Sequence, residues 1–270
     1  MILLEMLSYP FLARAMLVGL LVSLCAALLG TSLVLKRFSM IGDGLSHVGF
    51  GALAVATALG WAPLAVTIPV VVLAAVLLLR ISQSSRIRGD AAIALISSGA
   101  LALGVLVVSL TSGMNMNVSN YMFGSILTVS RADAVLSAAL CAAVLALFTL
   151  FYPRIFAVTF DETFARATGT RAQLYNTLLA VLTAVTVVLG MRMMGALLIS
   201  SLLIFPPLSA MRVFRSFRSV TLCSAAVSLA CFVLGMVCSY AFETPSGASV
   251  VAANIVCFGL CALAGKLLGR

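Results

Sequence analysis

Nine apolar runs, each long enough to form a helix that crosses a lipid bilayer, dominate the sequence and restrict what it can fold into. A spanning helix needs about 20 mostly apolar residues, because the bilayer core offers no hydrogen-bonding partner to an open backbone. Charged residues make up only 9% of the chain, so no segment has the polarity of a soluble nucleotide-binding or catalytic domain. We therefore predict an all-α fold, a polytopic bundle of about 8–9 transmembrane helices in a single domain over residues 1–270. Any energy for its function is expected to come from a partner or an ion gradient. The runs lie near residues 11–35, 44–60, 63–79, 91–112, 131–152, 173–190, 194–211, 219–241 and 248–265.

The basic residues are distributed unevenly between the two ends of these predicted helices. If the helices alternate in direction with the 36–43 junction inside, thirteen of the sixteen Lys and Arg residues fall on the cytoplasmic side. Cytoplasmic loops are enriched in Lys and Arg, which predicts a multi-pass protein of the cytoplasmic membrane with its N-terminal end outside and its C-terminal end inside. The net charge of +9 then reflects orientation and gives no support to nucleic-acid binding.

Residues 113–130 interrupt the series of apolar runs. Gly and Asn residues break the pattern at 113–117, and the apolar stretch at 121–127 is too short to cross a bilayer. We expect either an external or re-entrant half-helix that lines a substrate route, or an amphipathic helix on the membrane surface.

The only histidine of the chain, His47, stands four residues after Asp43 at the start of the second run. Residues i and i+4 of a helix lie on one face, so the carboxylate and the imidazole are expected to stand one turn apart. Such a pair can bind a first-row divalent cation, and two protein ligands suit loose binding that water, carbonyl groups or another helix completes. Since ionisable groups inside a membrane are costly and usually functional, the sequence predicts a metal-passage site at Asp43 and His47.

Structural explanations for the same residues stay open. Asp43 and His47 can form a hydrogen bond that only satisfies two polar groups, and Asp43 alone can cap a helix N-terminus. The face that they share continues to Gly51, with Ser46 and Gly49 beside it. These small residues allow either a hydrated route or the close approach of another helix.

Residues 160–171 form the longest polar connection between two apolar runs. Acidic residues at its start, Asp161 and Glu162, and Gly169 near its end are typical of a short capped helix. On the inferred topology this helix is cytoplasmic, where it can dock a cytoplasmic protein or simply be a solvated loop helix.

A pair of prolines, Pro206 and Pro207, lies inside the seventh apolar run. Each removes a backbone N–H, so we expect a helix kink and freed carbonyl groups that a neighbour must satisfy or that face a cavity. A kink that serves packing alone is the simpler explanation.

Three of these segments resemble, in order and over roughly residues 10 to 265, the membrane permeases of zinc/manganese-type ABC importers. The GDGLSH sequence at 42–47 is the most specific part of the resemblance. Thr163 stands where many relatives carry an acidic residue, which weakens a detailed transfer of contacts. The segments are Arg37 to His47, Phe160 to Glu162 with Ala165 and Gly169, and Gly195 to Leu198 with Pro206.

The resemblance implies a type II ABC importer fold and a homodimer of permeases around a central path. Two copies of an ATPase subunit would bind below, and an extracytoplasmic metal-binding protein would deliver the ion from above. Asp43 and His47 match the intramembrane metal ligands of that family. Its coupling helix, which sits in a cleft of the ATPase, matches Asp161, Glu162, Ala165 and Gly169.

The sequence contains no Gly-x-x-x-x-Gly-Lys-Ser/Thr phosphate loop. We therefore expect a transport subunit that has no enzyme activity and no resident cofactor. ATP is expected to be used by the partner subunit. The expected cargo is Zn²⁺, with Mn²⁺ next. One alternative is a secondary transporter that couples a divalent cation to protons through Asp43 and His47, because histidine changes charge near neutral pH. Another is an ABC permease for a metal chelate, although one Trp and five Tyr offer few aromatic residues for a wide cavity.

Overall fold

The computed structural model describes residues 6, 8–84, 89–111 and 131–267, and within these ranges it contains helices and no strand. Two short helices, α8 (Tyr152–Phe160) and α9 (Glu162–Ala167), lie between the long helices α7 and α10. The segment 113–130 lies outside the described residues, so its two alternatives stay open. The long helices are α2 (Pro10–Leu35), α3 (Ile41–Ala58), α4 (Pro63–Ser84), α5 (Gly89–Leu110), α7 (Arg131–Leu150), α10 (Ala172–Met194), α11 (Ala196–Val213), α12 (Phe217–Phe242) and α13 (Ser246–Leu267).

Eight of the long helices in the described ranges are long and apolar enough to cross a membrane. The remaining one, α3, occupies the place of the second predicted run, and Asp43, His47 and its glycines make it less apolar than the others. This arrangement confirms the predicted all-α polytopic bundle.

Two of the boundaries that differ from the sequence prediction have a clear local cause, and proline chemistry explains the first. The run expected at 131–152 ends at Leu150, and α8 begins anew with Pro153 in its first turn. Proline lacks the N–H that would continue the preceding helix, but it suits the start of a new one. The helix expected at 160–171 covers only Glu162 to Ala167, because Gly169 adopts a left-handed backbone with φ of 83° just after it.

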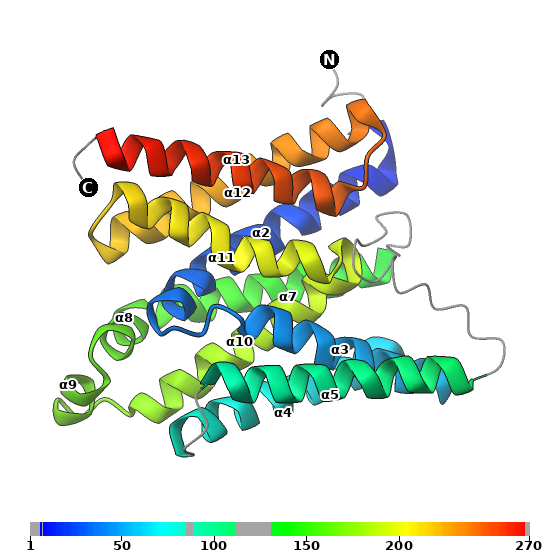
Figure 1. Cartoon of the computed structure of the whole chain (residues 1–270), viewed down its shortest axis with the longest axis horizontal. Helices are drawn as coiled ribbons and strands as arrows, with labels where there is room; N and C mark the ends of the chain where they lie inside the picture. The colour runs from blue at the N-terminus through cyan, green and yellow to red at the C-terminus, as the bar shows by residue number, and fades with distance from the viewer. Residues whose placement is uncertain (1–5, 7, 85–88, 112–130, 268–270) are drawn as a thin grey trace.

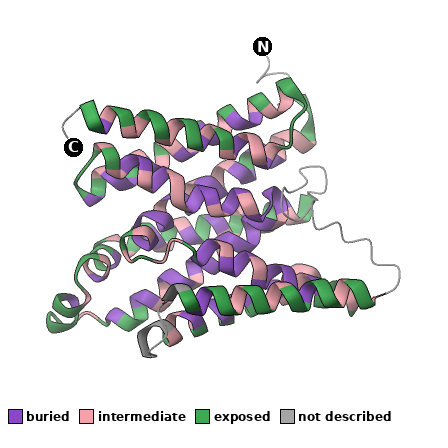
Figure 2. Ribbon diagram, viewed as in Figure 1, coloured by how far each residue is buried: buried purple, intermediate pink, exposed green. Residues whose placement is uncertain are grey.

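The helices form two groups joined by a central layer (Figure 1). α2, α11, α12 and α13 pack against one another, while α3 packs against both α4 and α5. α10 contacts α2, α3, α4 and α11, which places it between the groups. Burial follows this order, since α2, α10 and α11 are mostly buried and α5 and α13 are largely exposed along the bundle (Figure 2). The exposed side chains of these outer helices are apolar, as expected where lipid replaces water.

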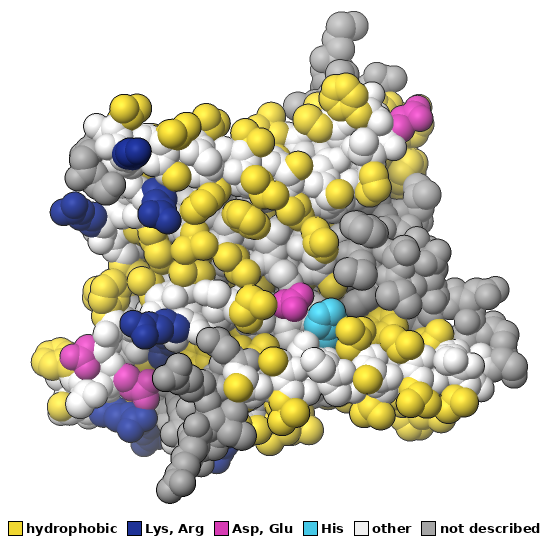
Figure 3. Space-filling view, in the orientation of Figure 1, with side chains coloured by type: hydrophobic (Ala, Val, Ile, Leu, Met, Phe, Trp, Pro, Cys, Tyr) yellow, Lys and Arg dark blue, Asp and Glu magenta, His cyan; other side chains and the backbone are white. Residues whose placement is uncertain are grey.

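The two ends of the bundle differ in charge. α8, α9 and the C-terminal end of α13 lie at the same end, on the left of Figure 1. Lys and Arg side chains gather at that end in Figure 3. The positive-inside rule assigns this end to the cytoplasm.

The proline pair lies within α11, which remains helical through Pro206 and Pro207. Proline at 207 cannot donate to the carbonyl of Leu203, four residues earlier, so that oxygen loses its helical partner. Gly30 of α2 packs directly against it, and a Cβ atom at Gly30 would overlap the Leu203 oxygen. The freed carbonyl therefore packs closely against a neighbouring backbone.

Candidate metal-passage site and coupling helix

The acidic residue and the histidine singled out in the sequence stand one turn apart on α3, as their spacing predicts. Asp43 lies in the first turn of the helix, where its charge is favourable to the helix dipole. His47 Nε2 lies 3.5 Å from Asp43 Oδ2. The Asp43 side chain is 44% exposed and that of His47 is 21% exposed, so an ion can reach both.

This pair lies on an open face of the bundle. Figure 3 shows the single histidine of the chain beside an acidic side chain, midway between the two ends and surrounded by hydrophobic side chains. The second ring nitrogen, His47 Nδ1, is buried and has no hydrogen-bond partner among the residues that the structure describes. Among the described residues, no group of three or more His, Cys, Asp or Glu side chains could hold a metal ion. The described residues therefore offer two candidate ligands at this position, one oxygen and one nitrogen, fewer than the four of a closed metal site.

The small residues of α3 let neighbouring helices approach closely. A Cβ atom at Gly51 would come within 2.7 Å of the Ala100 carbonyl oxygen on α5. The space beside Gly49 is filled by Met191 of α10. Of the two expectations for these residues, the structure shows close helix approach, which fixes α3 in its position against α5 and α10.

The predicted docking segment forms a compact corner at the cytoplasmic end. Asp161 caps α9, because its Oδ1 accepts a hydrogen bond from the Phe164 N–H at 2.9 Å. Ala165 is completely buried in a small cluster with Ala172 and Tyr175 at the start of α10. Phe164 is 65% exposed. α9 thus presents one aromatic side chain outward while its other face is anchored to α10.

The carboxylate of Glu162, at the start of α9, is engaged within the chain. Its Oε1 accepts from Arg166 at 2.5 Å, and its Oε2 accepts from Asn176 Nδ2 at 2.9 Å. Lys36, at the end of α2, lies 3.7 Å from the same Oε2, and its Nζ donates to Asn176 Oδ1. We call Lys36, Glu162 and Asn176 the polar junction, which connects α2, α9 and α10.

The polar junction perturbs the titration of both charged members. Burial lowers the pKa of Lys36 below its ordinary value, although the nearby Glu162 opposes this shift. Burial alone raises the pKa of Glu162, but the Asn176 hydrogen bond and the charges of Lys36 and Arg166 lower it overall. Glu162 is therefore ionised at neutral pH, beside the Lys36 amino group.

Three residues of these sites were not singled out in the sequence. Lys36 entered the argument only as a topology signal, and Asn176 is a polar residue inside an apolar run. An amide that is 3% exposed in a membrane helix needs a partner, which was the available signal. Phe164 is an aromatic residue in a polar segment, a pattern typical of docking surfaces.

Comparison with known proteins agrees with the resemblance of the motifs. Residues 8–265 match the model of the ABC 3 transport family. The manganese import system permease protein ScaB of Streptococcus gordonii is 28% identical, over 93% of this chain and 90% of that protein. The high-affinity zinc uptake system membrane protein ZnuB of Haemophilus influenzae is 27% identical, over 93% of this chain and 97% of that protein.

A solved structure shares the whole architecture. PsaBC from Streptococcus pneumoniae, in complex with Fab, superposes with a TM-score of 0.84 at 29% identity, covering 96% of this chain and 93% of that one. The family match, the relatives and the helical bundle point to the same kind of protein. The chain therefore belongs to the ABC 3 transport family, as a multi-pass metal-transport permease of the bacterial cytoplasmic membrane.

Proposed function

We propose that this permease forms the path of an ATP-driven importer for a divalent transition metal, in which Asp43 and His47 hold the ion in passage. The observation that carries the proposal is the 3.5 Å approach of a carboxylate and an imidazole on an open face of a membrane helix bundle. Ionisable groups are costly there, and a passing cation would give this carboxylate and imidazole a further partner.

A second copy of the permease completes the metal shell in this proposal. Two ligands bind a first-row cation weakly, which suits transport because the ion must also leave. The exposed position of Asp43 leaves room for an equivalent pair from a second copy across a homodimer interface. Four oxygen and nitrogen ligands then surround one ion.

Coupling to ATP hydrolysis is proposed to run through α9. Phe164 is the anchor that enters a cleft of an ATPase subunit, one on each permease copy. Asp161 and Gly169 define the two ends of α9, and Ala165 fixes it to α10, so the helix moves as one body with α10. An extracytoplasmic binding protein delivers the metal at the opposite end, as expected for an importer.

The polar junction connects the movement of α9 to the segment that carries the proposed metal ligands. Lys36 is the C-cap residue of α2, and Arg37 next to it has a left-handed backbone with φ of 62°. The chain then turns into α3, which begins at Ile41 and carries Asp43. A displacement of Glu162 therefore acts on the segment that positions the metal pair.

Zinc is the proposed cargo, with manganese as the principal competitor. Mixed oxygen and nitrogen ligands accept both ions, and for a given site the order of affinities places Zn²⁺ above Mn²⁺. The relatives described above are named for manganese and for zinc, which supports a transition metal and leaves the choice to measurement.

The test is metal uptake into vesicles that contain the permease with its ATPase and binding protein. Zinc and manganese are supplied alone and in competition, with and without ATP. Asp43→Asn and His47→Gln should abolish uptake. The control Glu243→Gln removes an exposed carboxylate at the extracytoplasmic end of the bundle and should retain uptake. Wild-type uptake by both site variants would refute the assignment, and proton-dependent uptake without ATP would identify a secondary transporter instead.

A further inference from the structure

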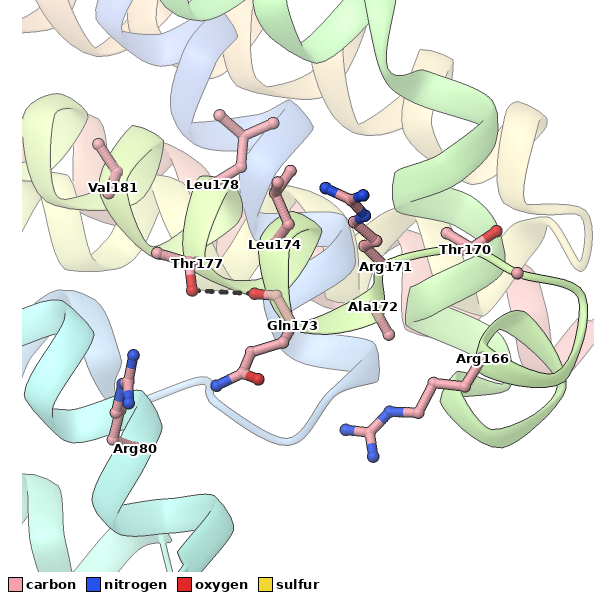
Figure 4. Close-up of a pocket in the computed structure, with 11 residues that line it drawn as sticks. Arg80, Arg166, Thr170, Arg171, Ala172, Gln173, Leu174, Thr177, Leu178 and Val181 are labelled. Atoms are coloured by element: carbon pink, nitrogen blue, oxygen red, sulfur yellow. Dashed lines mark hydrogen bonds between the residues drawn. The ribbon is translucent and has the colours of Figure 1, made fainter.

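A groove with a volume of about 970 Å³ opens at the cytoplasmic end of the bundle, between α4, α9 and the first half of α10 (Figure 4). It lies away from the metal pair, and the transport chemistry proposed above does not use it. Its walls have two distinct chemical characters, which together suggest what fills it.

The mouth of the groove is basic. Arg80 at the cytoplasmic end of α4, Arg166 on α9 and Arg171 before α10 all line it. Arg166 is paired with Glu162, whereas Arg80 and Arg171 form no ion pair with any residue that the structure describes. Figure 4 shows Gln173 between Arg80 of α4 and Arg166 of α9, with Arg171 directed to the other side of α10, next to Leu174. An anion at the mouth would meet uncompensated positive charge.

The inner part of the groove is apolar and reaches into the bilayer. Leu174, Leu178 and Val181 recur at helical spacing on one side of α10, and all three line the groove. From Ala172 to Val181 the helix rises about 14 Å, which carries the apolar wall from the membrane surface into the hydrocarbon region.

The face of α4 that carries Arg80 also carries exposed apolar side chains. Leu73 is 61% exposed and Leu77 is 47% exposed on that helix. Arg80 follows one turn later on the same face, at the level where phospholipid headgroups begin. A molecule from the cytoplasmic leaflet can therefore enter sideways.

We propose that this groove binds an anionic phospholipid of the cytoplasmic leaflet. The phosphate group lies at the basic mouth beside Arg80, and an acyl chain runs along Leu174, Leu178 and Val181. A soluble acidic protein segment does not reach the depth of Val181, and a free phosphate ion makes no use of the apolar wall. Charge and shape thus favour a lipid over either of these ligands.

The test measures binding of pyrene-labelled phosphatidylglycerol to the delipidated permease–ATPase complex in detergent. Arg80→Gln combined with Arg171→Gln removes both unpaired charges, and both side chains are exposed, so the fold should be kept. Since each basic side chain near an anionic lipid surface contributes roughly a factor of five, the double variant should bind about 30-fold more weakly. Arg215→Gln combined with Lys266→Gln is the matched control, with the same charge change at exposed cytoplasmic positions outside the groove.

The proposal is supported if only the groove variant loses phosphatidylglycerol, and if phosphatidylcholine and glycerol phosphate fail to displace the probe. Equal binding by all variants, or equal losses in the groove variant and the control, would overturn it. Displacement by glycerol phosphate would identify a soluble phosphate site. Loss of the ATPase from the groove variant with unchanged lipid binding would assign the groove to the ATPase.

Discussion

Replacing Glu162 with glutamine should destabilise the permease more than replacing its partner Lys36 with methionine. The reason lies in which charge is left behind in the polar junction. The Lys36 side chain is only 13% exposed, and in Glu162→Gln its ammonium keeps neutral acceptors such as Asn176 Oδ1 but loses the opposite charge. In Lys36→Met the ammonium disappears together with its desolvation cost, and Glu162 retains Arg166 and Asn176.

The magnitudes follow from these contacts. An unpaired, nearly buried charge costs about 3 kcal/mol, at the lower end of the range for broken buried pairs because both groups keep some solvent contact. Lys36→Met removes the donor to Asn176 Oδ1 and an ion-pair partner 3.7 Å from a carboxylate that keeps two hydrogen-bond donors, which together cost about 1 kcal/mol. The double variant should resemble Lys36→Met alone, which gives a coupling energy of about 3 kcal/mol in magnitude between the two positions.

The assay is equilibrium unfolding of the purified permease in mild detergent, followed by circular dichroism for the wild type, both single variants and the double variant. Lys36→Arg is the control that keeps the charge. In the assembled transporter Lys36→Met should continue to hydrolyse ATP but import less metal, because α9 has lost a link to the α2–α3 connection. The explanation would be refuted if Lys36→Met lowered the free energy of unfolding at least as much as Glu162→Gln. Purely additive effects of the two substitutions would also refute it.

Three further predictions concern packing, docking and pH. Gly51→Ala should destabilise the bundle by about 2 kcal/mol, because its new methyl group meets the Ala100 carbonyl oxygen at 2.7 Å; an unchanged thermal midpoint would contradict this. Phe164→Ala should weaken ATPase binding about 30-fold with no change in unfolding, as expected for an exposed aromatic anchor, and unchanged affinity in a pull-down titration would exclude that role. Burial raises the pKa of Glu162, but the Asn176 hydrogen bond and the nearby cations lower it overall from its ordinary value of 4.5. The ionised carboxylate therefore stabilises the fold above pH 4.5, and this stabilisation is lost on further acidification. Unfolding midpoints measured from pH 6 downward should show this loss in the wild type, and an equal loss in Glu162→Gln would contradict it.

The sequence predicted the helical bundle well because apolar runs of bilayer length have few alternative structures. The i, i+4 spacing likewise placed Asp43 and His47 on one face, since helix geometry alone decides that relation. The break at Pro153 was missed because the apolar character continues on both sides of it. Hydropathy reports where a helix is apolar but not where its backbone stops.

The polar junction could not be predicted in the same way. Lys36 and Asn176 come from distant parts of the chain, and their contact depends on how α2 and α10 pack. The distribution of basic residues placed Lys36 on the cytoplasmic side but predicted no contact for it. The groove likewise depends on the separation of α4 from the first half of α10, which no local pattern encodes.

The carbonyl of Leu203 makes two distant positions depend on each other during sequence drift. While proline occupies position 207, the Leu203 oxygen receives no N–H from that position, and only glycine at position 30 can lie against it. A substitution that restores an N–H at 207 would return the oxygen to its own helix and relax the demand for glycine on α2. We therefore expect Gly30 and Pro207 to covary among related permeases, with a side chain at position 30 tolerated only where the proline has been lost.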